Sequence, residues 1–348
     1  LRILTIIGNL LNDYEYLKEE AQMYNIDVLE TQKEGVTGRA NDGIIAEIVQ
    51  QAYSISPEKA KLLIEKVHGE RLTAGDLKEN YERPTEIGLK GLDDIYKIMT
   101  STFHVITGIP NHGKSVFLDQ CLLKLAQNNN WKFAIFSPEH STSMHIRRLV
   151  QMYLGKHFDE GFTQRMTKAE LNTGLDFINK HFYFIETKDA VPSIDLILNI
   201  CKSAVYKYGV KGLIIDPFNE VSAIRQGNQR EDEHIRDFIS LCKRFGRIHE
   251  LTTWVVAHPT KLPKGNDGSY SPPTAYDISG ASHWHNQADA VLTIHRDFDT
   301  NETEVITRKI REQGLYGKIG SVKFKYNINN HQFDVSETDD DWNSYMDS

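Results

Sequence analysis

The sequence contains few cysteines and no long apolar segment, and these absences exclude several classes of protein. Only 3 of its 348 residues are cysteine, and Cys121, Cys201 and Cys242 are too widely separated to have the spacing of metal ligands. A zinc ribbon is therefore excluded, and a reducing compartment is expected. No apolar run approaches the roughly 20 residues that span a membrane, and the N-terminus has neither a basic stretch nor a signal-like cleavage region. We therefore expect no membrane association.

The sequence also lacks an excess of positive charge. Its 48 acidic and 40 basic side chains give a formal net charge of −8, which argues against a protein whose whole surface binds duplex DNA. A ring could still hold one strand in a locally basic channel, so the net charge does not exclude nucleic acid. The remaining composition, 40% hydrophobic and 25% charged, is that of a globular protein with a sizeable core. The chain begins with Leu1, so it could be part of a longer protein.

Three regions differ in their sequence pattern. Residues 1–84 are expected to form a small, mainly helical N-terminal region or linker, because a Ser-Pro-Glu helix start precedes apolar residues at helical spacing. Residues 85–336 alternate short apolar runs with helical patterns, which predicts an α/β domain with a mostly parallel central sheet. Residues 337–348 are acidic and are expected to form a flexible tail.

The strands expected in the α/β domain are residues 103–107, 133–136, 182–185, 213–215, 254–257, 291–294, 305–310, 322–326 and 333–335. The first five are almost continuously apolar, as in a sheet that is buried on both faces. The last four follow one another without intervening helical patterns. We expect them to add antiparallel strands to one edge of the sheet.

Residues 108–115 read GIPNHGKS and match the phosphate-binding pattern GxxxxGK followed by Ser or Thr. The match follows an expected strand and opens an expected helix, and this context makes it specific; the alternative is a glycine turn that only starts a helix. Lys114 is expected to reach the β- and γ-phosphates of ATP, and the Ser115 hydroxyl is expected to bind Mg²⁺. The residues expected to bind the nucleotide are Gly108, Asn111, His112, Gly113, Lys114, Ser115 and Val116.

Two carboxylates follow other expected strands. A GLIID segment ends at Asp216, and an Asp at the end of a buried strand beside the P-loop strand could hold Mg²⁺ together with Ser115. Alone, a strand that ends in Asp is common. Glu139 follows the strand after the P-loop helix and could polarise the attacking water as a catalytic residue. The alternative is that Pro138 and Glu139 only cap the following helix.

Three further polar residues are candidates for contact with the nucleotide. His258 ends an expected strand and could hydrogen-bond the γ-phosphate or its water; the alternative is a turn histidine without such a role. Lys309 and Arg311 alternate along a late strand and therefore lie on one face. This spacing suits a pair that reaches a neighbouring subunit's nucleotide, with Arg311 as an arginine finger. The alternative is a solvated strand face.

Taken in order, these segments resemble the helicase domain of the DnaB family, which includes Twinkle and the phage primase-helicases. The resemblance covers about residues 85–327. The pieces that carry it are the P-loop, Glu139, the strand that ends at Asp216, the HPTK segment at residues 258–261, the stretch 276–292 with DISGAS and QADAVL, and the pair Lys309 and Arg311. Residues 1–84 match neither the helical domain of DnaB nor a zinc ribbon.

The resemblance implies a RecA-like P-loop ATPase that works as a replicative DNA helicase. Such a protein assembles as a ring, here expected to be a homohexamer, hydrolyses ATP with Mg²⁺ between subunits, and moves 5′-to-3′ along single-stranded DNA. By this analogy the residues that act within one subunit are Lys114, Ser115, Glu139, Asp216 and His258, and those that act on the neighbour's nucleotide are Lys309 and Arg311. It also places residues 260–276 in a central channel, where Lys261 and Lys264 would contact the DNA backbone. The alternative is an ordinary flexible surface loop.

The implied partners are single-stranded DNA, further copies of the chain, and a primase or polymerase. The acidic tail with Trp342 and Tyr345 could dock a polymerase or serve only as a solubilising end. The implied location is the cytoplasm of a bacterium or phage-infected cell, with a mitochondrial origin also open. Two other functions use the same core: a RecA- or RadA-like recombinase that forms filaments on single-stranded DNA, and a nucleotide-switched DNA-binding module that does not unwind.

Overall fold

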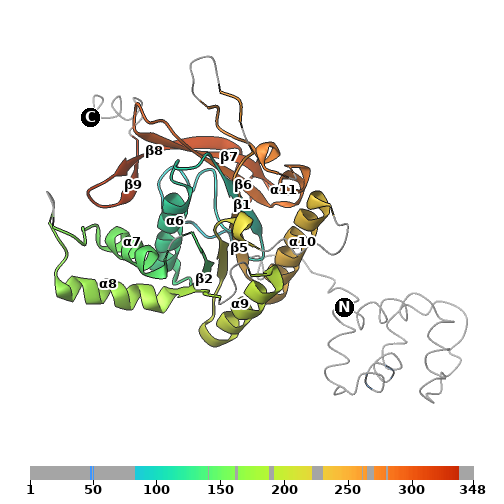
Figure 1. Ribbon diagram of the computed structural model, residues 1–348, viewed down its shortest axis with the longest axis horizontal. Coiled ribbons are helices and arrows are strands. Elements are labelled where there is room, and N and C mark those ends of the chain that lie inside the picture. Colours follow the sequence, from blue (N-terminus) through green and yellow to red (C-terminus); the bar gives the residue numbers. More distant parts are fainter. Residues whose placement is uncertain are drawn as a thin grey trace, which may run out of the picture. The chain divides into compact units, whose positions relative to one another are not determined.

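The structure is a computed structural model whose chain divides into two units, Leu1–Tyr81 and Glu82–Ser348. It describes residues 83–139, 141–160, 164–187, 192–221, 230–260, 262–264, 270–279 and 281–336, together with Ile48 and Gln50. The expected helical region at residues 1–84 therefore lies almost wholly outside the described residues, as does the expected tail at 337–348. The described residues of the second unit are drawn in colour in Figure 1.

A nine-stranded sheet forms the centre of this unit, in the order β3-β2-β4-β5-β1-β6-β7-β8-β9. The strands are β1 (Phe103–Thr107), β2 (Phe133–Phe136), β3 (Phe182–Phe184), β4 (Gly212–Ile215), β5 (Thr252–Val256), β6 (Ala290–Arg296), β7 (Glu302–Ile310), β8 (Gly320–Asn327) and β9 (Gln332–Val335). The helices are α6 (Lys114–Asn129), α7 (Thr142–Leu154), α8 (Lys168–His181), α9 (Ile194–Tyr208), α10 (Glu231–His249) and α11 (Ala281–Gln287), with short 3-10 turns η2 (Phe218–Glu220) and η3 (Ala275–Asp277).

Strands β3, β2, β4, β5, β1 and β6 are parallel, and β7, β8 and β9 continue from β6 as antiparallel neighbours. The expected mostly parallel sheet is confirmed, but the expectation for β6 was wrong, since this strand pairs in parallel with β1. The reason is α11, a short helix just before β6. The chain can therefore start β6 at the same edge as β1 instead of returning as a hairpin.

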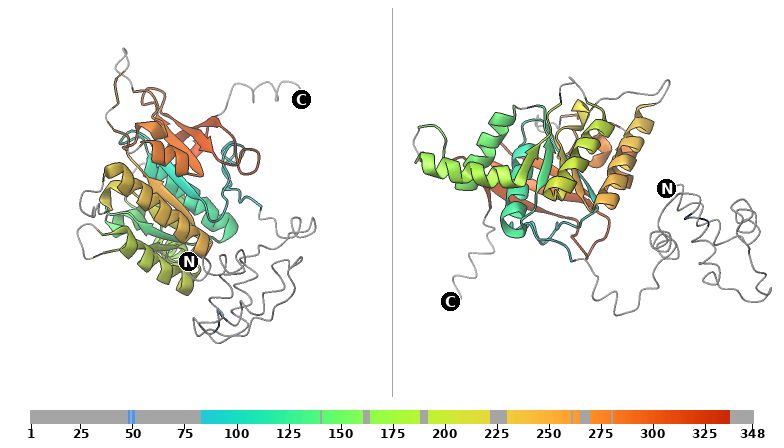
Figure 2. Two further views of the ribbon diagram at one scale, coloured as in Figure 1. Left: turned by 90° about the vertical axis from the view of Figure 1, so that its right-hand side faces the viewer. Right: turned by 90° about the horizontal axis from the view of Figure 1, so that it is seen from below.

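Helices cover both faces of the parallel strands (Figures 1 and 2). One core contains side chains of α6, α7 and α8, and the other contains side chains of α9, α10 and α11. Within a single strand the side chains alternate between these cores: Leu213 and Ile215 of β4 lie in the second core and Ile214 lies in the first. The almost continuous apolar runs in the sequence thus arise because both faces of each strand are buried. The three cysteines are buried and unpaired.

The parallel arrangement decides where functional residues can meet. The carboxyl ends of β1, β2, β4, β5 and β6 lie at one edge of the sheet, and the loops that follow these strands are neighbours there. We call this the carboxyl edge, and the edge where these strands begin the amino edge. In the described part of the chain, no helix is long and apolar enough to cross a membrane.

Candidate nucleotide-binding site

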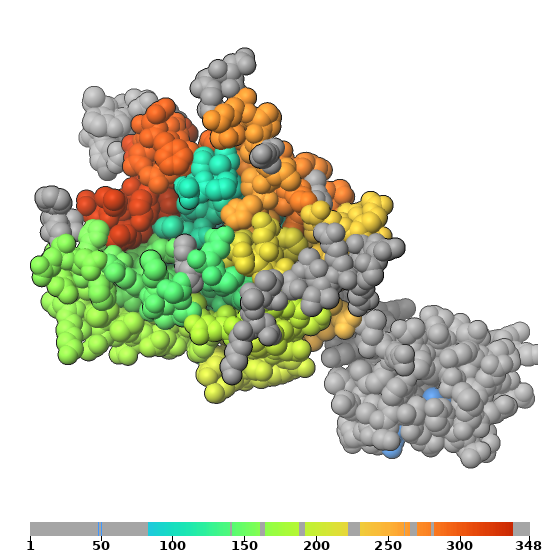
Figure 3. All heavy atoms as spheres, in the orientation of Figure 1, coloured from blue at the N-terminus to red at the C-terminus, as the bar shows by residue number. Residues whose placement is uncertain are grey.

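The phosphate-binding loop lies at the carboxyl edge, between the end of β1 and the start of α6. The strand and the helix that the sequence predicted around it are both present. Gly108 has φ +154°, and a Cβ atom there would lie 2.2 Å from the carbonyl oxygen of Ile294 in β6. Only glycine permits this approach, because any side chain would collide with backbone. In Figure 3 teal atoms, the colour of the β1–α6 region, reach the surface beside the orange and red C-terminal strands.

The N-terminus of α6 has the properties of an anion site. Its N-cap is Gly113, with φ +86°, and no side chain caps the first turn. The first N–H groups of the helix are therefore available to a ligand, and the helix dipole adds partial positive charge at the same end. A phosphate group fits this arrangement.

Lys114 supplies a full positive charge at this helix end. Its side chain is buried, and its Nζ donates a hydrogen bond to the carbonyl oxygen of Ile109, 3.0 Å away, within the loop. Burial lowers the pKa of the Lys114 ammonium to about 8, against the opposing effect of Asp216 and Glu139. The two carboxylates that the sequence assigned to the site thus lie close enough to stabilise the lysine's charge.

Asp216 follows β4 directly and is buried. Burial raises its pKa above the usual value; a hydrogen bond with Ser115 opposes the shift, and the nearby charges of Asp119 and Glu139 add to it. Ser115 and Asp216 therefore form a hydroxyl–carboxylate pair that a divalent cation would fit, because both supply hard oxygen ligands. Among the described residues, no group of three or more His, Cys, Asp and Glu side chains could hold a metal by itself. The other ligands of Mg²⁺ would come from phosphate and water.

Glu139 and His258 face each other from the loops after β2 and β5. The distance from His258 Nε2 to Glu139 Oε1 is 3.7 Å. Helix α7 is capped by Ser141, whose hydroxyl accepts a hydrogen bond from the Met144 N–H. The alternative in which Pro138 and Glu139 cap this helix is therefore wrong, and the Glu139 carboxylate, 43% exposed, is open to a ligand.

The environment of His258 favours its neutral form. Burial, followed by Lys114, lowers its pKa, while Glu139 acts in the opposite direction. Its Nδ1 atom is buried and has no hydrogen-bond partner. A neutral imidazole can accept a hydrogen bond from a water or donate one to a phosphate oxygen.

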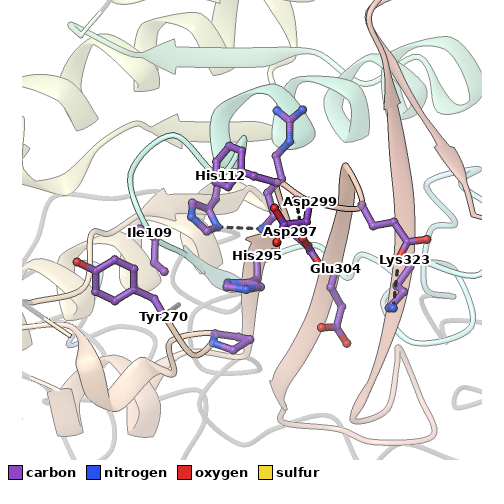
Figure 4. Close-up of a pocket in the computed structure, with 12 residues that line it drawn as sticks. Ile109, His112, Tyr270, His295, Asp297, Asp299, Glu304 and Lys323 are labelled. Carbon is purple, nitrogen blue, oxygen red and sulfur yellow. Dashed lines mark hydrogen bonds and ion pairs between the residues drawn. The ribbon is translucent and has the colours of Figure 1, made fainter. Parts of the chain in front are cut away.

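A cavity of about 680 Å³ adjoins the P-loop (Figure 4). Ile109 and His112 of the loop form one wall, and the end of β6 with the residues just after it forms another. Arg296 and Phe298 in that wall lie together, with the guanidinium 5.4 Å from the ring centre. The sequence analysis missed these two residues because they lie at the end of β6 and just after it, where the sequence has no motif. The strand was also expected to be antiparallel, so its end was not expected beside the P-loop.

Lys309 and Arg311 lie at the opposite, amino edge. Lys309 Nζ donates to the carbonyl oxygens of His285 and Asn286, the latter at 3.0 Å. Arg311 Nε donates to Asp289 Oδ1 at 2.7 Å, and Arg311 Nη2 lies within hydrogen-bond distance of three carbonyl oxygens at the end of α11. Both cations thus reach the same end of α11, in agreement with the prediction that they lie on one face. Arg311 itself comes one residue after the end of β7.

The amino edge is too far from the P-loop for either cation to act on its own chain's nucleotide. Asp289, which binds Arg311, also accepts a hydrogen bond from the N–H of Phe103, the first residue of β1, at 2.9 Å. The P-loop begins after the last residue of the same five-residue strand. At the rise of a β-strand, the start of the P-loop is therefore roughly 16 Å from Phe103. The Arg311 side chain is 40% exposed.

The channel-loop prediction is only partly within the described residues. Lys261 lies outside them. Lys264 is exposed and pairs by a β-bridge with Tyr270, whose ring centre is 5.4 Å from its ammonium. The lysine is thus at the surface of the segment predicted to touch DNA, beside an aromatic ring.

Comparisons with known proteins agree on one family. The family model for "DnaB-like helicase C terminal domain" matches residues 85–335. The chain is 36% identical over 261 residues to the Twinkle homolog protein, chloroplastic/mitochondrial, of Arabidopsis thaliana; the match covers 72% of this chain and 36% of the relative, so the chain spans about a third of the relative's length.

Two solved structures have the same fold. One is an ATPase domain, with a TM-score of 0.63 and 16% identity over 81% of this chain and 99% of that one. The other is a DnaB-like replicative helicase described with its primase interactions, with a TM-score of 0.64 and 16% identity over 86% of this chain and 76% of that one. The expected RecA-like ATPase fold is therefore confirmed.

Proposed function

The chain belongs to the family of DnaB-like helicase C-terminal domains, and from this premise we propose that it is an ATP-dependent replicative DNA helicase. In this proposal it moves 5′-to-3′ on single-stranded DNA as a ring, and ATP is hydrolysed between subunits. The observation that carries the proposal is the separation of the two sets of residues: Lys114, Asp216, Glu139 and His258 meet at the carboxyl edge, whereas Lys309 and Arg311 lie at the amino edge.

The residues at the carboxyl edge each have a role in hydrolysis. Backbone N–H groups of the P-loop and the Lys114 ammonium bind the phosphates, and Ser115 and Asp216 hold Mg²⁺. The cation, when bound, neutralises charge on the phosphate oxygens. Glu139 orients the attacking water and accepts its proton, since its carboxylate is exposed beside the lysine. His258 contacts the γ-phosphate or the water through its neutral imidazole.

The residues at the amino edge require a second subunit. Arg311 cannot reach the P-loop of its own chain, so a contact with nucleotide is possible only across an interface between copies. An interface that joins the carboxyl edge of one copy to the amino edge of the next uses two different surfaces, and such interfaces close into rings when the rotation permits. Arg311 would then stabilise charge in the transition state, and Lys309 would be a second phosphate contact.

The remaining partners follow from the proposed ring. Lys264, with Lys261 outside the described residues, would contact the DNA backbone in the central channel. A primase partner is proposed because one structural neighbour is described with its primase interactions; polymerase docking by the acidic tail stays a prediction.

The relative is chloroplastic or mitochondrial, so an organellar location is proposed alongside the cytoplasm of a bacterium or phage-infected cell. The family match favours the helicase over the recombinase and switch alternatives.

Steady-state hydrolysis and strand separation test this function together. We expect ATP turnover with Mg²⁺ that single-stranded DNA stimulates, and unwinding of a fork with a free 5′ tail but not of one with only a 3′ tail. Lys114→Ala should lower turnover by at least about 100-fold, because the residue's charge acts on the phosphates. Unchanged turnover in that variant, or unwinding only from a 3′ tail, would contradict the proposal.

A further inference from the structure

The tip of the P-loop is attached to the end of β6 by a single side chain. Nδ1 of His112 accepts a hydrogen bond of 2.9 Å from the backbone N–H of Arg296, the last residue of β6. Figure 4 shows this contact as a dashed line at the wall of the cavity. The P-loop pattern leaves the residue at this position open, so the motif does not require histidine here.

The contact exists only for one chemical form of the imidazole. An Nδ1 atom that accepts a hydrogen bond must carry a lone pair, so the ring is neutral and its proton is on Nε2. Burial, then His295, Lys114 and Arg296, lower the pKa of His112 to about 4, which keeps the ring neutral at physiological pH. The rings of His295 and Phe298 pack against it at centroid distances of 5.0 and 5.2 Å. The side chain is thus held in one orientation.

The backbone of the loop has few hydrogen bonds of its own, so contacts with neighbouring elements help to fix its shape. Asn111 and Gly113 both have left-handed backbone angles, with φ +67° and +86°. Within the loop, the His112 N–H donates to the Ile109 carbonyl oxygen over a long 3.3 Å, and the same oxygen accepts a hydrogen bond from Lys114 Nζ at 3.0 Å. At its start the loop packs on the Ile294 carbonyl through Gly108. The contact of His112 with Arg296 therefore fixes the other end of the loop to the same strand.

We propose that His112 is a positioning residue of the nucleotide site: its side chain holds the P-loop in the shape that binds phosphate by tying it to the end of β6. The inference rests on the proposed function, since it assumes that the loop binds a nucleoside di- or triphosphate. It gives a role to the side chain at a position where the P-loop pattern specifies no residue type. The same Arg296 that provides the N–H also lines the cavity, so one residue supports both the loop and the cavity wall.

Loss of this contact should weaken nucleotide binding without loss of the fold. A loop that spends only a fraction of its time in the binding shape has an apparent dissociation constant raised by the inverse of that fraction. One hydrogen bond of ordinary strength corresponds to a change of roughly three- to tenfold. The effect should appear in both ADP and ATP affinity, because both ligands carry the phosphates that the loop surrounds.

Two substitutions of the full chain separate the hydrogen bond from the bulk of the side chain. His112→Phe keeps an aromatic ring but removes the acceptor, whereas His112→Asn places an amide oxygen at the same number of bonds from Cβ as Nδ1. The measurements are the dissociation constant of a fluorescent ADP analogue with Mg²⁺, and the melting temperature without nucleotide. We expect H112F to bind roughly three- to tenfold more weakly, H112N to bind within about twofold of the unaltered chain, and both to melt within about 2 °C of it.

Three results would overturn the inference. They are an affinity of H112F equal to that of the unaltered chain, an H112N variant as weak as H112F, and a fall in affinity that comes with a matching fall in melting temperature. Lys114→Ala in the same assay tests the proposed function separately. If the unaltered chain binds the analogue and K114A does not, the P-loop site stands whatever His112 does; if neither H112F nor K114A changes binding, the proposed function fails.

Discussion

The two carboxylates of the site support the charge of its buried lysine. Lys114 is buried, and its ammonium remains charged near neutral pH because Asp216 and Glu139 lie close to it. Without these carboxylates burial would lower the pKa of Lys114 further. The site thus holds one buried cation and two carboxylates before any ligand binds, and the phosphates and Mg²⁺ of a nucleotide would add charges of both signs.

Glu139 is the residue whose proposed role can be tested most simply. Glu139→Gln keeps the size and hydrogen-bonding ability of the side chain but cannot accept a proton. We expect the turnover number to fall by about 10²- to 10⁴-fold while nucleotide affinity stays within a few-fold, because the carboxylate acts on the water and not on the phosphates. Steady-state rates and binding of a fluorescent analogue give the two values.

A matched control is Glu160→Gln. Glu160 is 87% exposed and forms a surface ion pair with Arg165, so this variant should hydrolyse ATP at the unaltered rate. If the turnover of Glu139→Gln is also unaltered, Glu139 is not the catalytic base, and the interpretation of its position beside His258 is wrong.

At the scale of elements, a buried cluster joins the P-loop helix to the next helix. Asp119 of α6 accepts hydrogen bonds from Nε2 of His145 at 2.9 Å and from Nε of Arg148 at 2.8 Å, both on α7. Asp119 lies one turn after Ser115, and α7 begins just after the segment with Glu139. The cluster therefore holds the helix that follows Glu139, the proposed catalytic base, against the helix that begins at the P-loop.

Asp119→Asn should destabilise the fold strongly. It removes the charge that compensates Arg148 in a buried place, and loss of one partner from a buried ion pair costs about 3 to 5 kcal/mol. Denaturant unfolding measures the change. The control is Asp159→Asn, which removes an exposed partner of Arg147 and should cost no more than about 1 kcal/mol. Equal effects of the two substitutions would show that the Asp119 cluster adds nothing beyond a surface pair.

The same cluster predicts a dependence of stability on pH. Burial alone would raise the pKa of Asp119, but Arg148 and His145 outweigh it and lower the pKa below its usual value of 3.8. A carboxyl with a lowered folded pKa stabilises the fold above the unfolded pKa, and this contribution is lost as the pH falls through the folded pKa. Below about pH 4 the unfolding free energy of the unaltered chain should therefore fall more steeply than that of Asp119→Asn. Parallel curves would show that Asp119 does not titrate as described.

The elements show what the sequence could and could not predict. All nine expected strands are present, because their apolar runs reflect burial on both faces. The direction of β6 could not be predicted, since it depends on a helix of only seven residues before it. The alternative in which Pro138 and Glu139 cap α7 is wrong because Ser141 provides the cap; both are common helix starts, and sequence alone does not choose between them.

The candidate site, too, could be predicted only in part from the sequence. Motif residues that end parallel strands could be placed together, because the topology brings strand ends to one edge. The contacts of His112 with Arg296 and of Asp119 with α7 could not be predicted, since the partners come from separate elements and have no motif. These contacts depend on tertiary packing, which residue spacing does not encode.

At the scale of the whole molecule, the sheet separates two half-sites. The phosphate-binding residues lie at the carboxyl edge, and the cations Lys309 and Arg311 lie at the amino edge, held by the end of α11 and Asp289. One subunit alone contains both sets of residues but cannot bring them together. In the proposed function, a complete site therefore forms where the carboxyl edge of one copy meets the amino edge of another, and ATP hydrolysis depends on assembly.

A mixture of two inactive variants tests this central claim most directly. Lys114→Ala inactivates the P-loop but keeps Lys309 and Arg311, whereas Arg311→Ala keeps the P-loop but removes the proposed arginine finger. The melting temperature and nucleotide affinity of Arg311→Ala check that loss of its contact with Asp289 leaves the fold intact. Each variant alone should hydrolyse ATP very slowly. If subunits mix at random in a ring with head-to-tail interfaces, an equal mixture should regain roughly a quarter of the unaltered rate, since about one interface in four would join two intact halves. A mixture no more active than the mean of its components, although mass measurements show that mixed assemblies form, would contradict the account.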